Sequence, residues 1–239
     1  MKRLTVVLVA LAGATSCGYK QPIGEMCGNA GAASFSIPKS EIYIWESGAV
    51  SAPQAGSAVN VTGVVLMLRW PGMDSRSGNN YDEFYDTYMR SLGPTPWFSV
   101  LMHRPDREHS REVLSNLLKF NMENSMRGGQ MTYMHDVYGL RHAVYQSAPG
   151  QSYRNIWFYW GEPNVDGAVD HYIICKNSVP DRPKDRLRLC VNTFYMSEIN
   201  MRISINYRDD MLNEWLKMQQ GVRKHLLSRI EECEIEVVV

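Results

Sequence analysis

Short segments rich in β-branched and aromatic residues follow one another through the second half of the chain, and this spacing limits the possible folds more than any other feature. The segments cover 155–160, 168–175, 189–195 and 201–207, after a hairpin of 131–138 and 141–146 across Gly139. Closely spaced strands separated by turn residues are typical of an antiparallel sheet. The second half is therefore predicted to be sheet-rich.

The segment 201–207 shows the clearest alternation. One face carries Met201, Ile203, Ile205 and Tyr207, and the opposite face carries Arg202, Ser204 and Asn206. Because successive side chains of a strand point to opposite faces, the strand is predicted to have one buried and one polar face.

Helices are predicted where apolar residues recur at helical spacing. These helices cover 81–92, the stretch from Ser110 to the Gly128-Gly129 pair, and the stretch from Asp209 or Asp210 to Ile230. Further strands are predicted at 41–46, 59–70 and 97–102. The predicted fold class is α+β: a mostly antiparallel sheet covered by two or three helices, including a C-terminal amphipathic helix.

Composition excludes several classes of protein. Hydrophobic residues make up 44% of the 239 residues, which is more than a disordered chain carries. The 25 basic and 25 acidic side chains balance, whereas a nucleic-acid-binding protein usually has a basic excess or stripe. A chain of this length buries a core without help from a metal or a dense disulfide framework.

The N-terminus predicts export. Lys2 and Arg3 precede an uncharged, mostly apolar run over 4–14, which is too short to span a hydrocarbon core of roughly 30 Å. The next residues, Ala14-Thr15-Ser16-Cys17, resemble a bacterial lipobox, whose cysteine is lipidated and becomes the first residue after cleavage. A plain secretory signal, with Cys17 merely near its cleavage site, is the alternative.

The predicted domain organisation follows from this site. Residues 1–16 are the signal peptide, 17–34 are the lipidated cysteine and a Gly- and Ala-rich flexible tether, and 35–239 are one α+β domain. If the domain has two lobes, the boundary between them is predicted near 128–129. Gly18 after the lipobox cysteine resembles an outer-membrane sorting signal, so the expected location is the periplasm, with the lipid in the outer membrane.

Export to an oxidising compartment raises the question of how the other four cysteines pair. Cys175 ends one predicted strand and Cys190 begins the next, so antiparallel pairing would bring them together in a disulfide; two buried thiols are the alternative. A second disulfide, Cys27–Cys233, would tie the tether to the C-terminal helix. No CxxC or HxxxH spacing occurs, and neither a metal site nor a cofactor is predicted.

The sequence carries none of the GxSxG, GxxxxGK[ST], GxGxxG or HExxH motifs. A more informative feature is the aromatic segment 155–160, which holds Trp157, Tyr159 and Trp160. Packing in the core is one interpretation of these residues. The other is that one or two of them are exposed and bind a protein partner, because Trp and Tyr dominate many interfaces.

The layout as a whole resembles a known family. The lipobox, the Cys175 and Cys190 strand pair, the strand 202–207 and the helix carrying Leu212, Trp215, Val222 and Leu226 are similar to periplasmic lipoprotein immunity proteins of type VI secretion effectors, particularly inhibitors of phospholipase toxins. The resemblance rests mainly on 155–230 and assigns no functional residue. It implies a non-enzymatic protein, attached to the membrane by lipid, that binds a secreted toxin and blocks it.

Two other functions stay open. A structural or assembly lipoprotein of the cell envelope, or of a secretion complex, would share the export signal and have no toxin partner. A periplasmic hydrolase with a dispersed site would use His135 or His142 as its general base.

Substitution of the predicted lipidation site gives a first test. Because the lipid would be carried on the Cys17 sulfur, Cys17→Ser is expected to release the protein from the membrane fraction or to block its processing. Cell fractionation with immunoblotting measures both effects. A Cys17→Ser protein that still sediments with membranes at the mature size would show that lipid on Cys17 does not hold the chain.

Overall fold

The computed structural model describes residues 25–30, 33–47, 59–89, 94–103, 110–125, 129–147, 155–177 and 188–230. Its strands are β1 (Glu25–Ala30), β2 (Ala33–Pro38), β3 (Ile42–Ser47), β4 (Val59–Arg69), β5 (Asp74–Ser75), β6 (Trp97–Met102), β7 (Gly129–Val137), β8 (Leu140–Ser147), β9 (Asn155–Trp160), β10 (His171–Asn177), β11 (Arg188–Met196) and β12 (Met201–Arg208). Its helical segments are α1 (Tyr81–Glu83), η1 (Phe84–Met89), α2 (Arg111–Ser125), η2 (Asp209–Glu214) and α3 (Trp215–Leu227). The predicted α+β class is confirmed.

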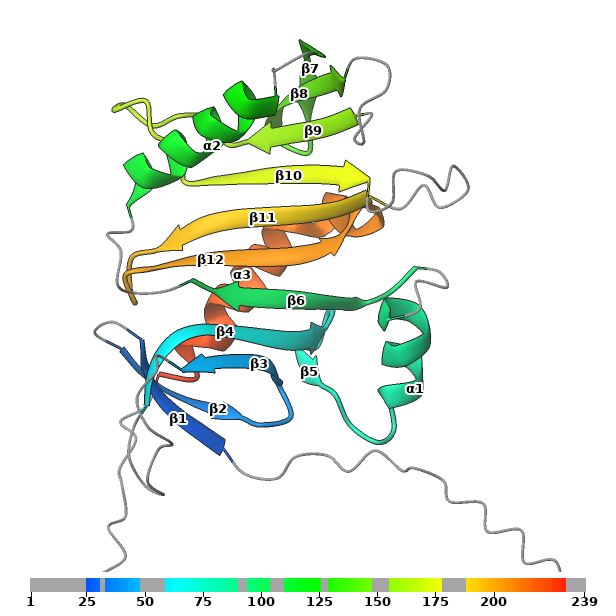
Figure 1. The fold of residues 1–239 in the computed structure, drawn as a ribbon, viewed down its shortest axis with the longest axis vertical. Helices are drawn as coiled ribbons and strands as arrows, with labels where there is room; N and C mark the ends of the chain where they lie inside the picture. Colours follow the sequence, from blue (N-terminus) through cyan, green and yellow to red (C-terminus); the bar gives the residue numbers. More distant parts are fainter. Residues whose placement is uncertain are drawn as a thin grey trace, which may run out of the picture.

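The strands form one sheet in the order β2-β1-β4-β6-β12-β11-β10-β9-β8-β7, with β3 and β5 also paired to β4 (Figure 1). The strands from β7 to β12 are consecutive neighbours and pair antiparallel, as the spacing of the sequence predicts. Only β1 and β4 pair in parallel among the described strands. Because β7 starts at Gly129 and continues this sheet, the structure shows no lobe boundary at that point.

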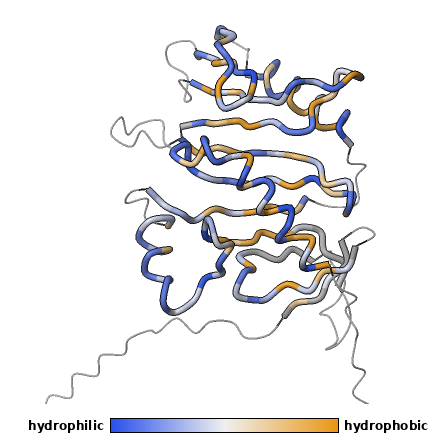
Figure 2. The backbone as a smooth tube through the Cα atoms, turned by 180° about the vertical axis from the view of Figure 1, so that it is seen from behind, coloured by the Kyte–Doolittle hydropathy of each residue, from blue (hydrophilic) through white to orange (hydrophobic). Residues whose placement is uncertain are grey.

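The two faces of the sheet are covered by different helices. On β9, Ile156, Phe158 and Trp160 pack in one cluster with Leu114 and Leu118 of α2. Tyr159, which points the other way, belongs to the larger cluster that contains the buried residues of α3. Helices α2 and α3 therefore lie on opposite faces, and strands between them are buried on both sides (Figure 1). Consistent with this, β10 is hydrophobic along its middle and hydrophilic at both ends (Figure 2).

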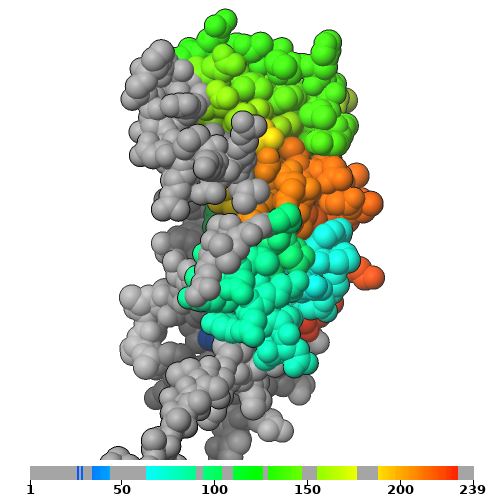
Figure 3. All heavy atoms as spheres, turned by 90° about the vertical axis from the view of Figure 1, so that its right-hand side faces the viewer, coloured from blue at the N-terminus to red at the C-terminus, as the bar shows by residue number. Residues whose placement is uncertain are grey.

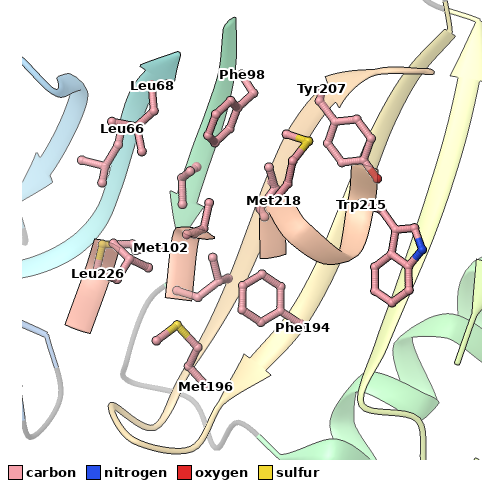
Figure 4. Packing of buried hydrophobic residues seen from close by; sticks show 14 of the residues in the cluster. Leu66, Leu68, Phe98, Met102, Phe194, Met196, Tyr207, Trp215, Met218 and Leu226 are labelled. Carbon is pink, nitrogen blue, oxygen red and sulfur yellow. The ribbon is translucent and has the colours of Figure 1, made fainter. Parts of the chain in front are cut away.

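Helix α3 presents one apolar stripe to the sheet. Trp215, Met218, Val222 and Leu226 are its buried residues. They recur at the spacing of one helical face and meet Phe98, Phe194 and Tyr207 from three strands (Figure 4). Burial raises the pKa of the Tyr207 hydroxyl far above its usual range. This packing confirms the predicted C-terminal amphipathic helix.

The predicted helix cap at Asp209 or Asp210 is wrong, because the chain first makes the 3₁₀ segment η2 and α3 begins at Trp215. The Asp209 carboxylate is engaged elsewhere: it accepts from Arg188 Nε at 2.6 Å. The cap predicted for α2 is present, since Ser110 Oγ accepts from the Val113 amide at 3.2 Å.

The structure also corrects the predicted tether. Residues 25–30 pair with 33–38 as the hairpin β1–β2, and an isolated bridge joins Phe35 to Ile230 beyond α3. Small side chains favoured a flexible segment on composition alone, but the backbone hydrogen bonds of a hairpin do not depend on side-chain size.

A buried ion-pair group holds this N-terminal region to α3. Glu41 is almost fully buried and accepts from His225 Nε2 at 2.8 Å and from Arg229. Its carbonyl also accepts from the Met67 amide at 2.8 Å. A buried carboxylate without its partners would be strongly destabilising, so this group fixes the end of α3 against β4 and the turn before β3.

The cysteines predicted to pair lie opposite one another. Cys175 of β10 and Cys190 of β11 are register partners, with 4.0 Å between their Cα atoms, and they form a disulfide. Both side chains are buried in the cluster that contains α3. Cys17 and Cys233 lie outside the described residues, and the predicted Cys27–Cys233 disulfide stays a prediction.

Two leucines of α3 test how much this packing stabilises the fold. Leu226 is fully buried, whereas Leu216 keeps 47% of its surface exposed. Leu226→Ala leaves a cavity in the core and is expected to lower the free energy of unfolding by about 2–5 kcal/mol. Leu216→Ala, the matched control, is expected to change it by less than about 0.5 kcal/mol. Urea unfolding measures both; equal losses would mean that α3 does not pack by this face.

Candidate functional site: the exposed β7 edge and a pocket beside α2

The three predicted partner-binding residues lie on β9, and the prediction that one or two of them are exposed is wrong. Tyr159 and Trp160 keep only 4% and 9% of their surface exposed, and Trp157 is half-buried. The reason is the place of β9 in the sheet, between β8 and β10 and with apolar cover on both faces. The sequence shows an aromatic strand but does not show how many strands flank it.

Trp157 and Tyr159 are occupied by internal contacts. The guanidinium of Arg188 lies 4.3 Å from the centre of the Trp157 ring. The Tyr159 ring stacks on His142 with 4.5 Å between ring centroids. These two side chains therefore serve packing.

Trp160 supports an exposed aromatic residue on the neighbouring hairpin. The Tyr133 ring on β7 meets Trp160 edge-on, with 6.3 Å between ring centroids, and keeps 71% of its surface exposed. One side of Tyr133 is thus held by the core while the rest faces solvent. A tyrosine fixed in this way loses little conformational entropy when a partner binds.

Tyr133 belongs to a larger exposed surface, which we call the β7 edge and define as Tyr133, Met134 and Tyr138. Met134 and Tyr138 are each about half exposed. The turn at Tyr138 is fixed from behind, because Trp215 Nε1 of α3 donates to its carbonyl at 3.1 Å. In the space-filling view the hairpin, coloured green, forms one end of the molecule (Figure 3).

The strand itself is an unusual sheet edge. None of the nine residues of β7 is buried, and β7 ends the strand order of the described sheet. Edge strands are usually protected from pairing by lysine, proline or bulges. β7 contains no lysine or proline, Asp136 is its one formally charged residue, and the register shift between Met134 and Val137 affects only one end. This edge is therefore suited to contact another protein.

Sequence reasoning missed the β7 edge. In the segment 129–137, apolar residues occur at both odd and even positions: Met131, Tyr133 and Val137 at odd ones, and Met134 at an even one. Apolar side chains therefore point to both faces without a regular alternation. A strand with that pattern and one charge has no single face for the core. This irregular pattern is the sequence feature that indicates an exposed edge strand.

A second feature is a pocket on the face opposite α3, where α2 overhangs β10 and β11. It has a volume of about 470 Å³, and its lining includes His103, Thr193, Arg202 and Ser204. Arg202 Nη2 lies 3.0 Å from His103 Nδ1, and His103 Nε2 lies 2.7 Å from Ser204 Oγ. We call this feature the α2 pocket.

The Ser204 and His103 pair superficially matches a nucleophile with its base, but the hydrogen bonds run in the wrong direction. A guanidinium only donates, so His103 Nδ1 accepts from Arg202 and the proton of the neutral ring is on Nε2. Nε2 then donates to Ser204 and does not accept its proton. The Ser204 hydroxyl also pairs with Thr193 Oγ1 at 3.0 Å. This arrangement positions polar groups and does not activate the serine.

The histidines proposed for a hydrolase are placed differently. His135 is exposed on β7, whereas His142 stacks on Tyr159. Burial, followed by the positive charge of Arg188, lowers the pKa of His142. A hydrogen bond with the backbone of His135 acts in the opposite direction. His171 resembles it: its ring stacks on Trp215, and burial lowers its pKa. Within the described residues, the buried Nε2 of His142 has no hydrogen-bond partner, so it is not paired with a hydroxyl or thiol there.

Two further observations concern the described part of the chain. No group of three or more His, Cys, Asp or Glu side chains there is arranged to hold a metal ion. None of its helices has the length and hydrophobicity needed to cross a membrane.

The fold is similar to two solved structures. One is Smlt3025, an immunity protein of the Stenotrophomonas maltophilia type IV secretion system, with a TM-score of 0.54, 17% identity, and coverage of 87% of this chain and 93% of that chain. The other is the Neisseria meningitidis iron-regulated outer membrane lipoprotein FrpD, with a TM-score of 0.54, 9% identity, and coverage of 89% and 97%. At these identities the likeness shows a common fold. No family model and no curated protein sequence matches the chain.

Proposed function

We propose that this chain is a membrane-anchored periplasmic immunity protein, which binds a secreted antibacterial toxin and blocks it. Two lines of reasoning support the proposal. The N-terminus has the pattern of an exported lipoprotein, with Cys17 at the lipobox. The fold is similar to that of an immunity protein over 87% of this chain.

The observation that carries the proposal is the β7 edge. A long strand edge with exposed aromatic and methionine side chains, and with only one charge, is costly to leave uncovered in a secreted protein. Tyr133 is held by Trp160 and Tyr138 by Trp215, so the surface is prepared for binding without rearrangement. A toxin segment that pairs with this edge would be held by backbone hydrogen bonds and by aromatic side chains together.

The finer identity of the toxin rests on the sequence resemblance. We propose a type VI effector with phospholipase activity, and an anchor in the outer membrane. A lipid anchor would concentrate the inhibitor at the membrane that such a toxin attacks, without requiring any new contact. The immunity protein of similar fold belongs to a type IV secretion system.

A second function is favoured by the other structural likeness. FrpD is an outer membrane lipoprotein, so a structural or assembly role in the envelope is the alternative. The two functions differ in their partner. An assembly protein would co-purify with envelope components in cells that make no toxin, and an immunity protein would not.

We propose that inhibition is stoichiometric occlusion and not an enzymatic reaction on the toxin. Purified mature protein is titrated against the activity of its cognate secreted toxin. The expected result is a break near one equivalent, because each toxin molecule is covered by one inhibitor. Neutralisation far below one equivalent, with turnover, would contradict occlusion.

The same titration tests the β7 edge. Tyr133→Ala is expected to weaken toxin binding by about 2 kcal/mol or more, roughly thirtyfold in Kd, with a nearly unchanged melting temperature. Tyr43, an exposed tyrosine on β3, provides the matched control, and Tyr43→Ala is expected to leave Kd unchanged. Trp160→Ala, by contrast, removes a core residue and is expected to lower stability by about 3–5 kcal/mol. Equal affinity for the Tyr133 and Tyr43 variants would place the toxin elsewhere.

A further inference from the structure

The strand β7 has the properties of a sheet edge that is complementary to itself. It ends the strand order of the described sheet, and none of its residues is buried. It lies at the opposite end of the molecule from β1 and β2, so two copies meeting edge to edge at β7 keep their N-terminal strands apart (Figure 1). Without a toxin this edge is unpaired, and unpaired edges of this kind associate with other strands.

The ring of Tyr133 lies over the sheet and leaves the outer side of β7 clear. Its register partner on β8 is Ala143, whose small side chain is fully buried. The ring therefore reaches across β8 to Trp160 on β9, where the two ring centroids are 6.3 Å apart. Tyr133 thus does not shield the outward N–H and C=O groups of β7, which are the groups that a further strand needs.

Regular geometry is limited to one part of the strand. β7 pairs with β8 without a shift from Gly129 to Met134, and the register is irregular between Met134 and Val137. A two-fold axis perpendicular to the sheet pairs each residue with one that lies an even number of positions away, because paired side chains must share a face. An axis through Thr132 uses residues 130–134 of both copies, all of them in the regular part.

The side chains on the α2 face favour this axis. It places Tyr133 of each copy opposite Met131 of the other, and Met131 already packs against the cluster that contains the buried residues of α2. Contact between a methionine sulfur and an aromatic ring is favourable. An axis through Met131 would instead place Tyr133 opposite Gly129, which has no side chain to contact.

The other face and the charges are compatible with the same axis. Thr132 meets its own counterpart, and Gln130 meets Met134. Asp136, the one formally charged residue of the strand, lies outside the paired residues. No like charges therefore face each other along the paired part of the two strands.

We propose that, without toxin, this protein forms a reversible two-fold dimer in which β7 of two copies pairs antiparallel about Thr132. Five residues from each strand make a small interface, and small interfaces are weak. The protein is therefore a monomer with an open edge when dilute and a dimer where it is concentrated. A toxin that binds β7 competes with the second copy. This competition rests on the proposed function, whereas the self-pairing does not.

Sedimentation velocity of the purified mature protein, from low micromolar concentration to about 0.2 mM, suits a weak interface and tests the proposal. The expected result is a reversible shift from the mass of one chain to that of two. Thr132→Lys places two positive charges opposite each other on the axis and is expected to weaken dimerisation at least tenfold. Asn116→Lys adds the same charge on the exposed side of α2 and is the control, expected to dimerise like the unchanged protein. A single chain at every concentration, or equal dimerisation of the two variants, would overturn the proposal.

A cysteine on the axis tests the register. Residues that face each other across antiparallel strands have Cα atoms about 4.5–5.5 Å apart, which is within disulfide range. Thr132→Cys is therefore expected to link two chains through this residue on oxidation. Gln130→Cys, the control, lies opposite Met134 and is expected not to link. Mass spectrometry of unreduced peptides identifies the linked residues and so excludes disulfides of the native cysteines. Linkage through neither residue, or through both equally, would contradict pairing about Thr132.

Addition of toxin separates this proposal from the proposed function. If both hold, toxin converts the dimer into a complex of one inhibitor chain and one toxin chain. A toxin complex that still forms the Thr132→Cys linkage would support the dimer and place the toxin away from β7. Absence of dimerisation, with a break near one equivalent in the toxin titration, would overturn the dimer alone.

Discussion

The packing of α3 against the sheet is the interaction on which the rest of the structure depends. Its buried stripe, from Trp215 to Leu226, covers strands that come from both halves of the chain. Glu41, His225 and Arg229 fix the end of the helix to the N-terminal strands, while Trp215 holds the Tyr138 turn at the opposite end. One helix thus joins the N-terminal strands, the central strands and the turn that follows β7.

The sequence predicts well what depends on local pattern. The alternation in 201–207, the cap at Ser110 and the pairing of Cys175 with Cys190 appear in the structure as expected. The errors concern properties that only the assembled sheet determines. The sequence of β9 is aromatic whether the strand lies at an edge or inside the sheet. Asp209 is a favourable cap residue by sequence, but β11 brings Arg188 beside it, and the two side chains pair. The α2 pocket escaped prediction for the same reason, because His103 and Ser204 are far apart along the chain.

Some residues of this protein contribute to both stability and binding, and others contribute to binding alone. Buried aromatic residues such as Trp160 and Trp215 contribute to both, since each packs in the core and also positions a residue of the β7 edge. Substitutions at these residues would therefore change folding and binding together. The exposed residues Tyr133, Met134 and Tyr138 are free to vary without loss of core packing, which is how one fold could serve different partners.

Hydrogen–deuterium exchange of the protein with and without its toxin tests the central claim most directly. Alternate amides of β7 pair with β8, and the others point away from the sheet. If the toxin binds the β7 edge, exchange of these outward amides in 129–137 slows on complex formation, and exchange in β3 does not change. Protection of another surface, with β7 exchanging as in the free protein, would contradict the account.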